Sequence, residues 1–151
     1  MVDVEYLKDY MFDIIGAMYN VQNELGLGLN EYCYQEGLQI ELIKQQIPFA
    51  REVVFHPKYN GEEMKAHIKV DFLCKRDVIV ECKGVAELLP IHRAQLFSYM
   101  RIAECSCGIL VNFGQPGKLY IERYFYDKFS KEILTVDGYP IHKERNIIEL
   151  R

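Results

Sequence analysis

Two acidic residues and one lysine stand close together in the middle of the chain, as Asp71, Glu81 and Lys83. If residues 75–77 form a three-residue hairpin loop, counting back along the two strands places Asp71 directly opposite Glu81. Two carboxylates opposed at roughly 5 Å repel each other unless a cation or a proton lies between them. Because magnesium and manganese ions prefer oxygen ligands, this spacing predicts a site for Mg²⁺ or Mn²⁺.

The residues next to Glu81 complete such a site. Strand geometry places Lys83 on the same face as Glu81, where its charge can position an attacking water or stabilise a phosphorane-like transition state. The backbone carbonyl of Cys82 offers a further oxygen ligand. The alternative interpretation is an ordinary solvated strand face, on which the two carboxylates form cross-strand ion pairs with Lys69 and Lys83.

Two helices are expected before the first strand. Apolar residues recur at helical spacing over 4–25, and Gly26 follows at the position where a left-handed residue ends a helix. Asn30 is a good N-cap for a second helix, which runs to about Gln46 before a proline.

The rest of the chain alternates strand and turn patterns. The predicted strands are 52–59, 63–74, 78–82, 108–113 and 119–125. The turn Asn60-Gly61 joins the first two strands as a tight hairpin. Pro90 begins a third helix, which continues to about Ala103 and forms a right-handed crossover between the third and fourth strands, so these two should lie parallel. The order α-α-β-β-β-α-β-β predicts an α/β fold with a mixed central sheet flanked by helices, and no element is assigned beyond Asp127.

The composition indicates one folded domain in the cytoplasm. With 151 residues, half of them hydrophobic, the chain can bury one core but is too short for two, so a single domain over 1–151 is expected. Five cysteines at irregular spacing favour free thiols in a reducing compartment over disulfides. No stretch approaches membrane-spanning length, and the N-terminus carries acidic residues instead of an apolar signal core, so a cytoplasmic location without membrane association is predicted.

The charge of the chain bears on its partners. A formal net charge of −4 and a pI of about 5.6 do not indicate a nucleic-acid-binding protein, because clustered Lys and Arg supply most of the affinity for phosphates. A metal site built from carboxylates makes the formal net charge more negative, and a bound cation reverses the charge locally. If the substrate is nucleic acid, a homodimer or a protein partner is expected to supply the positive surface.

The arrangement of the central residues is similar to that of a known superfamily. Asp71, followed ten positions later by Glu81-x-Lys83 in a hairpin and then by a helix, resembles the PD-(D/E)XK nuclease superfamily. Val70 stands in place of the proline of that name.

Three further stretches resemble the bacterial GxxExxY proteins, which belong to the same superfamily. Residues 28–34, Gly-Leu-Asn-Glu-Tyr-Cys-Tyr, match the signature of that family. Residues 95–99, Gln-Leu-Phe-Ser-Tyr, and 108–114, Gly-Ile-Leu-Val-Asn-Phe-Gly, are similar to its remaining blocks. The resemblance covers about residues 4–125.

This resemblance implies a restriction-endonuclease-like fold and a nuclease that uses Mg²⁺ or Mn²⁺ to hydrolyse phosphodiester bonds of nucleic acid, with DNA favoured. It implies that Asp71 and Glu81 bind the metal and that Lys83 is catalytic. The superfamily often adds an acidic ligand from an N-terminal helix, and Glu31 is the residue that matches it here. A structural role at the start of the helix is the alternative for Glu31, since a carboxylate there interacts favourably with the helix dipole. The resemblance places Gln95 beside the active site, in contact with substrate or with a water on the metal.

Three more residues are candidates for substrate binding. Tyr99 lies one turn beyond Gln95 on the same helix face, and His92 shares that face. Tyr34 lies one turn beyond Glu31, and its alternative role is local packing or hydrogen bonding.

Two other functions remain open from the sequence. One is a non-catalytic interaction module that keeps the fold and acts in a larger assembly, which the acidic charge favours. The other is a phosphoesterase on small nucleotides, because small ligands need no extended basic surface.

Overall fold

The computed structural model describes residues 2–141. Within these residues a seven-stranded mixed sheet has the order β1-β4-β5-β6-β7-β8-β9, and β2 and β3 form a separate pair. The elements are α1 (Val4–Leu25), α2 (Glu31–Lys44), β1 (Phe49–Phe55), β2 (Lys58–Tyr59), β3 (Glu62–Glu63), β4 (Ile68–Cys74), β5 (Val78–Lys83), α3 (Pro90–Ala103), β6 (Cys107–Asn112), β7 (Tyr120–Asp127), β8 (Glu132–Leu134) and β9 (Pro140–Ile141). The predicted α/β architecture with a mixed central sheet flanked by helices is confirmed.

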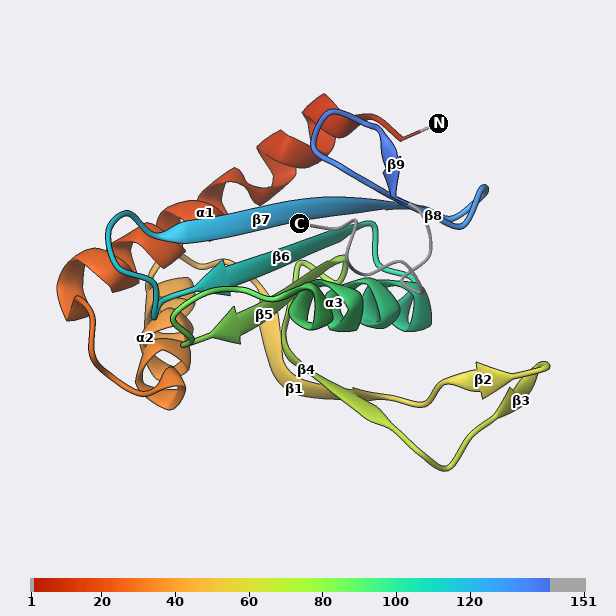
Figure 1. Cartoon of the computed structure of the whole chain (residues 1–151), viewed down its shortest axis with the longest axis horizontal. Helices are drawn as coiled ribbons and strands as arrows, with labels where there is room; N and C mark the ends of the chain where they lie inside the picture. Colours follow the sequence, from red (N-terminus) through yellow and green to blue (C-terminus); the bar gives the residue numbers. More distant parts are fainter. Residues whose placement is uncertain (1, 142–151) are drawn as a thin grey trace.

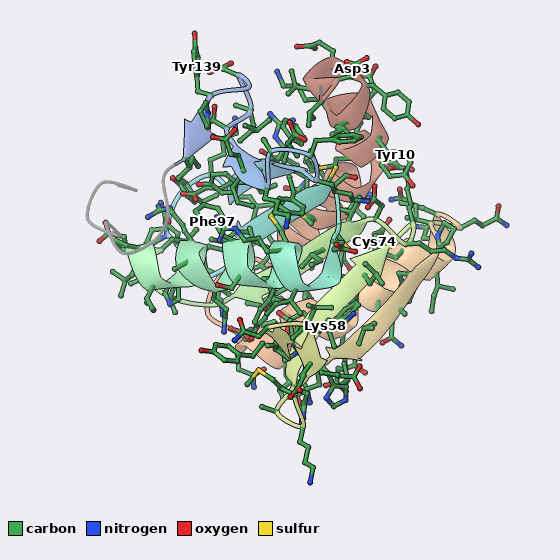
Figure 2. All side chains as sticks on the ribbon, turned by 90° about the vertical axis from the view of Figure 1, so that its right-hand side faces the viewer. Asp3, Tyr10, Lys58, Cys74, Phe97 and Tyr139 are labelled. Carbon is green, nitrogen blue, oxygen red and sulfur yellow. The ribbon has the colours of Figure 1, made fainter. Side chains whose placement is uncertain are left out.

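Two hydrophobic cores hold the helices to opposite faces of the sheet (Figure 1). The larger core joins α1 and α2 to one face, through side chains such as Met18, Leu38 and Val80. The smaller core joins α3 to the other face, where Phe97 lies between the helix and the strands (Figure 2) and stacks edge-on against Tyr124 of β7. None of the helices in residues 2–141 is long and apolar enough to cross a membrane.

The helix boundaries follow the capping residues. The helix α1 ends at Leu25 and is capped by Gly26, whose positive φ of +68° a glycine adopts without strain. The side chain of Asn30 caps α2 by accepting a hydrogen bond of 3.0 Å from the backbone N–H of Cys33. The helix α2 ends at Lys44, slightly before the predicted end at about Gln46.

The predicted parallel arrangement is confirmed, because β5 and β6 are parallel and α3 connects them. The predicted long hairpin differs from the structure. The strands β1 and β4 pair through most of their length, and the chain between them forms a short arm, β2 and β3, that projects from the body (Figure 1). The arm turns at Asn60-Gly61, both at positive φ, as expected. The strands β8 and β9 lie beyond the last predicted element and extend the edge of the sheet.

The cysteines are free thiols in the structure, and four of the five are buried. The expected domain over 1–151 includes residue 1 and residues 142–151, which lie outside the described residues.

Candidate active site

The hairpin of β4 and β5 has the predicted register. Residues 75–77 form the loop, and the paired residues run from Cys74 and Val78 to Phe72 and Val80. The next level of the hairpin is Asp71 and Glu81, where side chains replace the regular pairing. The backbone N–H of Asp71 donates to Glu81 Oε2 at 2.7 Å, and the backbone N–H of Cys82 donates to Asp71 Oδ2 at 2.8 Å. The two carboxylates therefore lie where the strands part.

The neighbouring strand β1 is irregular at the same level. Its pairing with β4 omits Glu52, which would face Asp71 and has a φ of +52° that is unusual for a residue other than glycine. A regular strand would place Val70 and Phe72 on one face, yet Val70 packs in the core under α3 and Phe72 in the core under α1 and α2. The side chains of β4 therefore change faces at Asp71, at the level where Glu52 interrupts the pairing with β1.

Burial and mutual repulsion disfavour the charged forms of these two carboxylates. Glu81 is only 3% exposed, and this burial, together with the nearby charge of Asp71, raises its pKa well above the ordinary value for glutamate. Burial also raises the pKa of Asp71, while the N–H of Cys82 and the charge of Lys83 act in the opposite direction. The alternative of a solvated strand face does not describe this structure, since Glu81 is buried and Lys83 makes its hydrogen bond elsewhere.

The helix α3 brings two predicted residues to the site. The ammonium of Lys83 donates to Gln95 Oε1 at 3.0 Å, and Gln95 Nε2 donates to the hydroxyl of Tyr99 at 3.2 Å. Burial and the charge of Glu81 both raise the pKa of Tyr99, so this phenol lies within electrostatic range of the carboxylates. A hydrogen-bonded row of three side chains therefore lies at the C-terminal end of β5. It consists of Lys83, Gln95 and Tyr99.

A buried ion pair anchors α3 on its other side. The guanidinium of Arg93 donates to both carboxylate oxygens of Glu122 on β7, each at 2.7 Å. The hydroxyls of Tyr120 and Tyr124 also donate to Glu122. The sequence does not predict this network, because residues so far apart in the chain leave no spacing pattern. The network fixes the position of α3, the helix that also carries Gln95.

Glu31 approaches the carboxylates from α2. Gly84, directly after Lys83, lies so close that a Cβ there would be 3.5 Å from the Cβ of Glu31. Burial and the charge of Asp71 raise the pKa of Glu31. Gln35 Nε2 donates to Glu31 Oε2 at 3.2 Å. Three acidic side chains, from α2, β4 and β5, therefore lie within electrostatic range of one another.

The donor set of this site fits a hard divalent cation. Within residues 2–141, no three His, Cys, Asp or Glu side chains are arranged as a complete ligand group. Mg²⁺, however, usually keeps several waters and takes only one or two carboxylates from the protein. Asp71 and Glu81 supply such a pair, and their mutual repulsion is the electrostatic condition that a bound cation relieves.

Tyr34 occupies a different place from the substrate-binding position expected for it. Its ring is fully buried and stacks on Phe113 with the centroids 4.8 Å apart. Its hydroxyl donates to the carbonyl of Gly26 at 2.6 Å and accepts from the N–H of Leu29 at 3.3 Å. Gly28 lies in the same turn at a φ of +100°, which only glycine adopts readily. Tyr34 therefore braces the turn that leads into α2, instead of contacting a substrate.

His92 remains beside the site. Its Nδ1 accepts a hydrogen bond of 3.0 Å from the N–H of Leu89, which satisfies one free donor at the start of α3. Its ring also lines a shallow pocket together with Lys83, Gln95 and Ser98. This pocket adjoins the row formed by Lys83 and Gln95.

Asn112 is a further residue that the sequence analysis did not assign to the site. It is fully buried at the end of β6, and its amide bonds both the N–H and the carbonyl of Val85, at 3.1 and 2.9 Å. It also accepts from the N–H of Gly114 at 3.1 Å. Asn112 thus fixes the backbone that follows Lys83.

The replacement Gly114→Ala is expected to destabilise the protein and disturb this loop. A Cβ at Gly114 would lie 2.6 Å from the carbonyl carbon of Gly84 and 2.7 Å from the backbone nitrogen of Val85. Backbone atoms cannot rotate away from such a clash as a flexible side chain can. Overpacking of this kind typically costs about 1–3 kcal/mol. Urea denaturation measures the loss, with Gly16→Ala as the control, because nothing lies within 4 Å of a Cβ there. Equal stability of the two variants would contradict the expectation.

Comparison with known proteins finds a matching family and a similar solved structure. The family model described as the PD-(D/E)XK nuclease superfamily matches residues 8–124, a range that includes Asp71, Glu81 and Lys83. The solved structure entitled "Crystal structure of SSO0001" is similar with a TM-score of 0.50 and 20% sequence identity, over 77% of this chain and 52% of that chain. The chain therefore spans about half the length of that protein, and the likeness shows the fold. No curated protein matches the chain.

Proposed function

The chain belongs to the PD-(D/E)XK nuclease superfamily, and we propose that it is a metal-dependent nuclease that hydrolyses phosphodiester bonds of nucleic acid, with DNA favoured. The buried, mutually repelling pair of Asp71 and Glu81, with Lys83 two residues further along the strand, is the observation that supports this proposal most directly. We also propose that the chain is a single domain and one of the bacterial GxxExxY proteins, acting in the cytoplasm.

In this proposal Asp71 and Glu81 hold Mg²⁺ or Mn²⁺, with Glu31 and the backbone carbonyl of Cys82 as further ligands. One oxygen of Asp71 and one of Glu81 accept backbone N–H groups, which orients both carboxyl groups and leaves their second oxygens for a cation. Such an ion, when bound, stabilises negative charge on a phosphate and lowers the pKa of a bound water.

Lys83 is the proposed catalytic residue of the chain itself. Its ammonium is held by Gln95 Oε1, so it is oriented before a substrate arrives and needs little reorganisation. A positive charge at this position can orient the attacking water or stabilise charge that develops on the phosphate oxygens. Gln95 fixes the ammonium, and Tyr99 in turn hydrogen-bonds Gln95.

The substrate side of the site is the pocket along α3. His92 and Ser98 line it beside Lys83 and Gln95, and these side chains offer hydrogen-bonding groups to a phosphate or a sugar. The chain carries 22 acidic and 18 basic residues, so a homodimer or a protein partner is proposed to add positive surface. This charge also favours a second candidate, the non-catalytic interaction module of the same fold.

The replacement Asp71→Asn is expected to weaken Mn²⁺ binding at least tenfold, because it removes the charge of one of two opposed carboxylates. Titration calorimetry of the purified protein measures the affinity. Asp9→Asn is the matched control, since it removes an exposed carboxylate on α1. Equal Mn²⁺ affinity of wild type and Asp71→Asn, or no binding by wild type at millimolar concentrations, would overturn the metal site.

Cleavage assays distinguish the remaining functions. Metal-dependent cleavage of DNA or RNA, weakening as the salt concentration rises, supports the nuclease. Turnover confined to small phosphoesters would identify a phosphoesterase on small nucleotides. Metal binding or nucleic-acid binding without cleavage of any substrate would identify the interaction module.

A further inference from the structure

We infer that Gln35 and Arg51 are positioning residues that hold Glu31 in place beside Asp71 and Glu81. The inference rests on the proposed function, because it assigns a task within the same site. Neither Gln35 nor Arg51 belongs to the sequence motifs described above.

The contacts of Gln35 determine how Glu31 is held. Gln35 is 7% exposed, and its Oε1 accepts a hydrogen bond of 2.8 Å from the guanidinium of Arg51. An arginine can only donate, so Arg51 requires the oxygen end of the amide on its own side. The NH₂ end must then face Glu31, to which it donates at 3.2 Å. Arg51 therefore makes Gln35 a hydrogen-bond donor toward Glu31.

Arg51 also ties α2 to the strand that carries Asp71. It lies on β1 opposite Phe72 of β4, and its guanidinium lies over the Phe72 ring, 5.0 Å from the centroid. The same guanidinium donates to Gln39 Oε1 at 2.9 Å. Glu31 and Asp71 are thus connected through one rigid, planar group that contacts both of their elements.

One donor of Arg51 makes no hydrogen bond in this arrangement. Arg51 Nε is buried and has no hydrogen-bond partner among the described residues. A buried donor without a partner typically costs about 1–3 kcal/mol. Contacts to the two glutamines and to the Phe72 ring orient the guanidinium, and in this orientation Nε makes no hydrogen bond.

Gln39 provides a matched control within the chain. Gln35 and Gln39 lie one turn apart on α2, and each accepts one hydrogen bond from Arg51. Gln35 also contacts Glu31, whereas Gln39 lies two turns from it. Gln35→Met is expected to weaken Mn²⁺ binding on the order of tenfold, as loss of a group that orients a metal ligand commonly does. Gln39→Met is expected to weaken the affinity less than Gln35→Met does, because Arg51 keeps its hydrogen bond to Gln35 and its contact with the Phe72 ring.

A double-mutant cycle separates positioning from a general effect on the fold. If Gln35 acts through Glu31, adding Gln35→Met to Glu31→Gln should cause no further loss of Mn²⁺ affinity, measured by calorimetry. Arg51→Lys keeps the charge but loses the planar fork, and it should weaken binding in the same direction even if Gln35→Met folds poorly. Circular dichroism and urea denaturation establish that each variant is folded.

The outcomes distinguish this inference from the proposed function. Wild-type binding of Mn²⁺ that is lost in Asp71→Asn but equal in Gln35→Met, Gln39→Met and Arg51→Lys would overturn the inference alone. Additive losses in the double mutant would also overturn it. Absence of Mn²⁺ binding by the wild type would overturn both.

Discussion

Lys83→Ala is expected to keep the fold and Mn²⁺ binding but to lower Mg²⁺-dependent cleavage on the order of 100-fold or more. The lysine contacts Gln95 and supplies no oxygen to a cation, so its loss removes a preoriented charge and leaves the carboxylates in place. The replacement of a surface lysine would leave cleavage unchanged. Such substitutions usually change only the stability, and by less than about 0.5 kcal/mol. Single-turnover cleavage of labelled DNA, with an EDTA control against contaminating nuclease, measures the effect.

Lys69→Ala is the control for that experiment. Lys69 lies on the same hairpin, two residues before Asp71, but it is exposed and pairs through its backbone with Val54 of β1. The cleavage rate of Lys69→Ala should equal that of the wild type. Comparable cleavage by Lys83→Ala and wild type would exclude the proposed role of Lys83.

The central hairpin could be predicted because its signals are local. The length of the loop at 75–77 and the alternation of side chains along two adjacent strands set the register that places Asp71 level with Glu81. Caps at Gly26 and Asn30 likewise set the helix ends through contacts within a few residues. The i, i+4 relation of Gln95 and Tyr99 is equally local, and the structure shows the hydrogen bond between them.

The remainder of the site depends on contacts between distant segments. The pairs Arg93 with Glu122, and Arg51 with Gln35, join elements that no periodicity connects, so sequence spacing could not reveal them. The motif at residues 28–34 makes Tyr34 a candidate for substrate binding, whereas in the structure Tyr34 braces a turn. Tertiary packing decides such roles.

The shape of the sheet around Asp71 was equally inaccessible from the sequence. Alternation of side chains assumes a regular strand, and the positive φ of Glu52 breaks that assumption at the level of the site. The short strands β8 and β9 carry too few residues to show a period of two. These features are set by pairing with neighbouring strands.

The raised pKa of Glu81 predicts how the metal-free protein responds to pH. Below the ordinary pKa of glutamate, about 4.3, the carboxyl group is protonated in both native and unfolded chains. As the pH rises further, the unfolded chain releases this proton first and the buried native group keeps it, so stability falls. The loss continues until the pH passes the raised native pKa, with a slope of up to about 1.4 kcal/mol per pH unit. Asp71, whose pKa is also raised, acts in the same direction.

Glu81→Gln is therefore expected to be more stable than wild type at pH 8 without metal, with the difference shrinking toward pH 4. Glutamine keeps the size of the side chain and removes the charge that burial and Asp71 disfavour. Urea denaturation in EDTA across this pH range measures the difference, and added Mn²⁺ should stabilise only the wild type at high pH, since it binds the ionised carboxylates. Glu122→Gln is the opposite control: hydrogen bonds from Arg93 lower the pKa of Glu122, so that variant should lose stability at neutral pH. A metal-free Glu81→Gln protein that is less stable than wild type at pH 8 would show that the Glu81 charge is already compensated, and would remove the electrostatic case for a cation between Asp71 and Glu81.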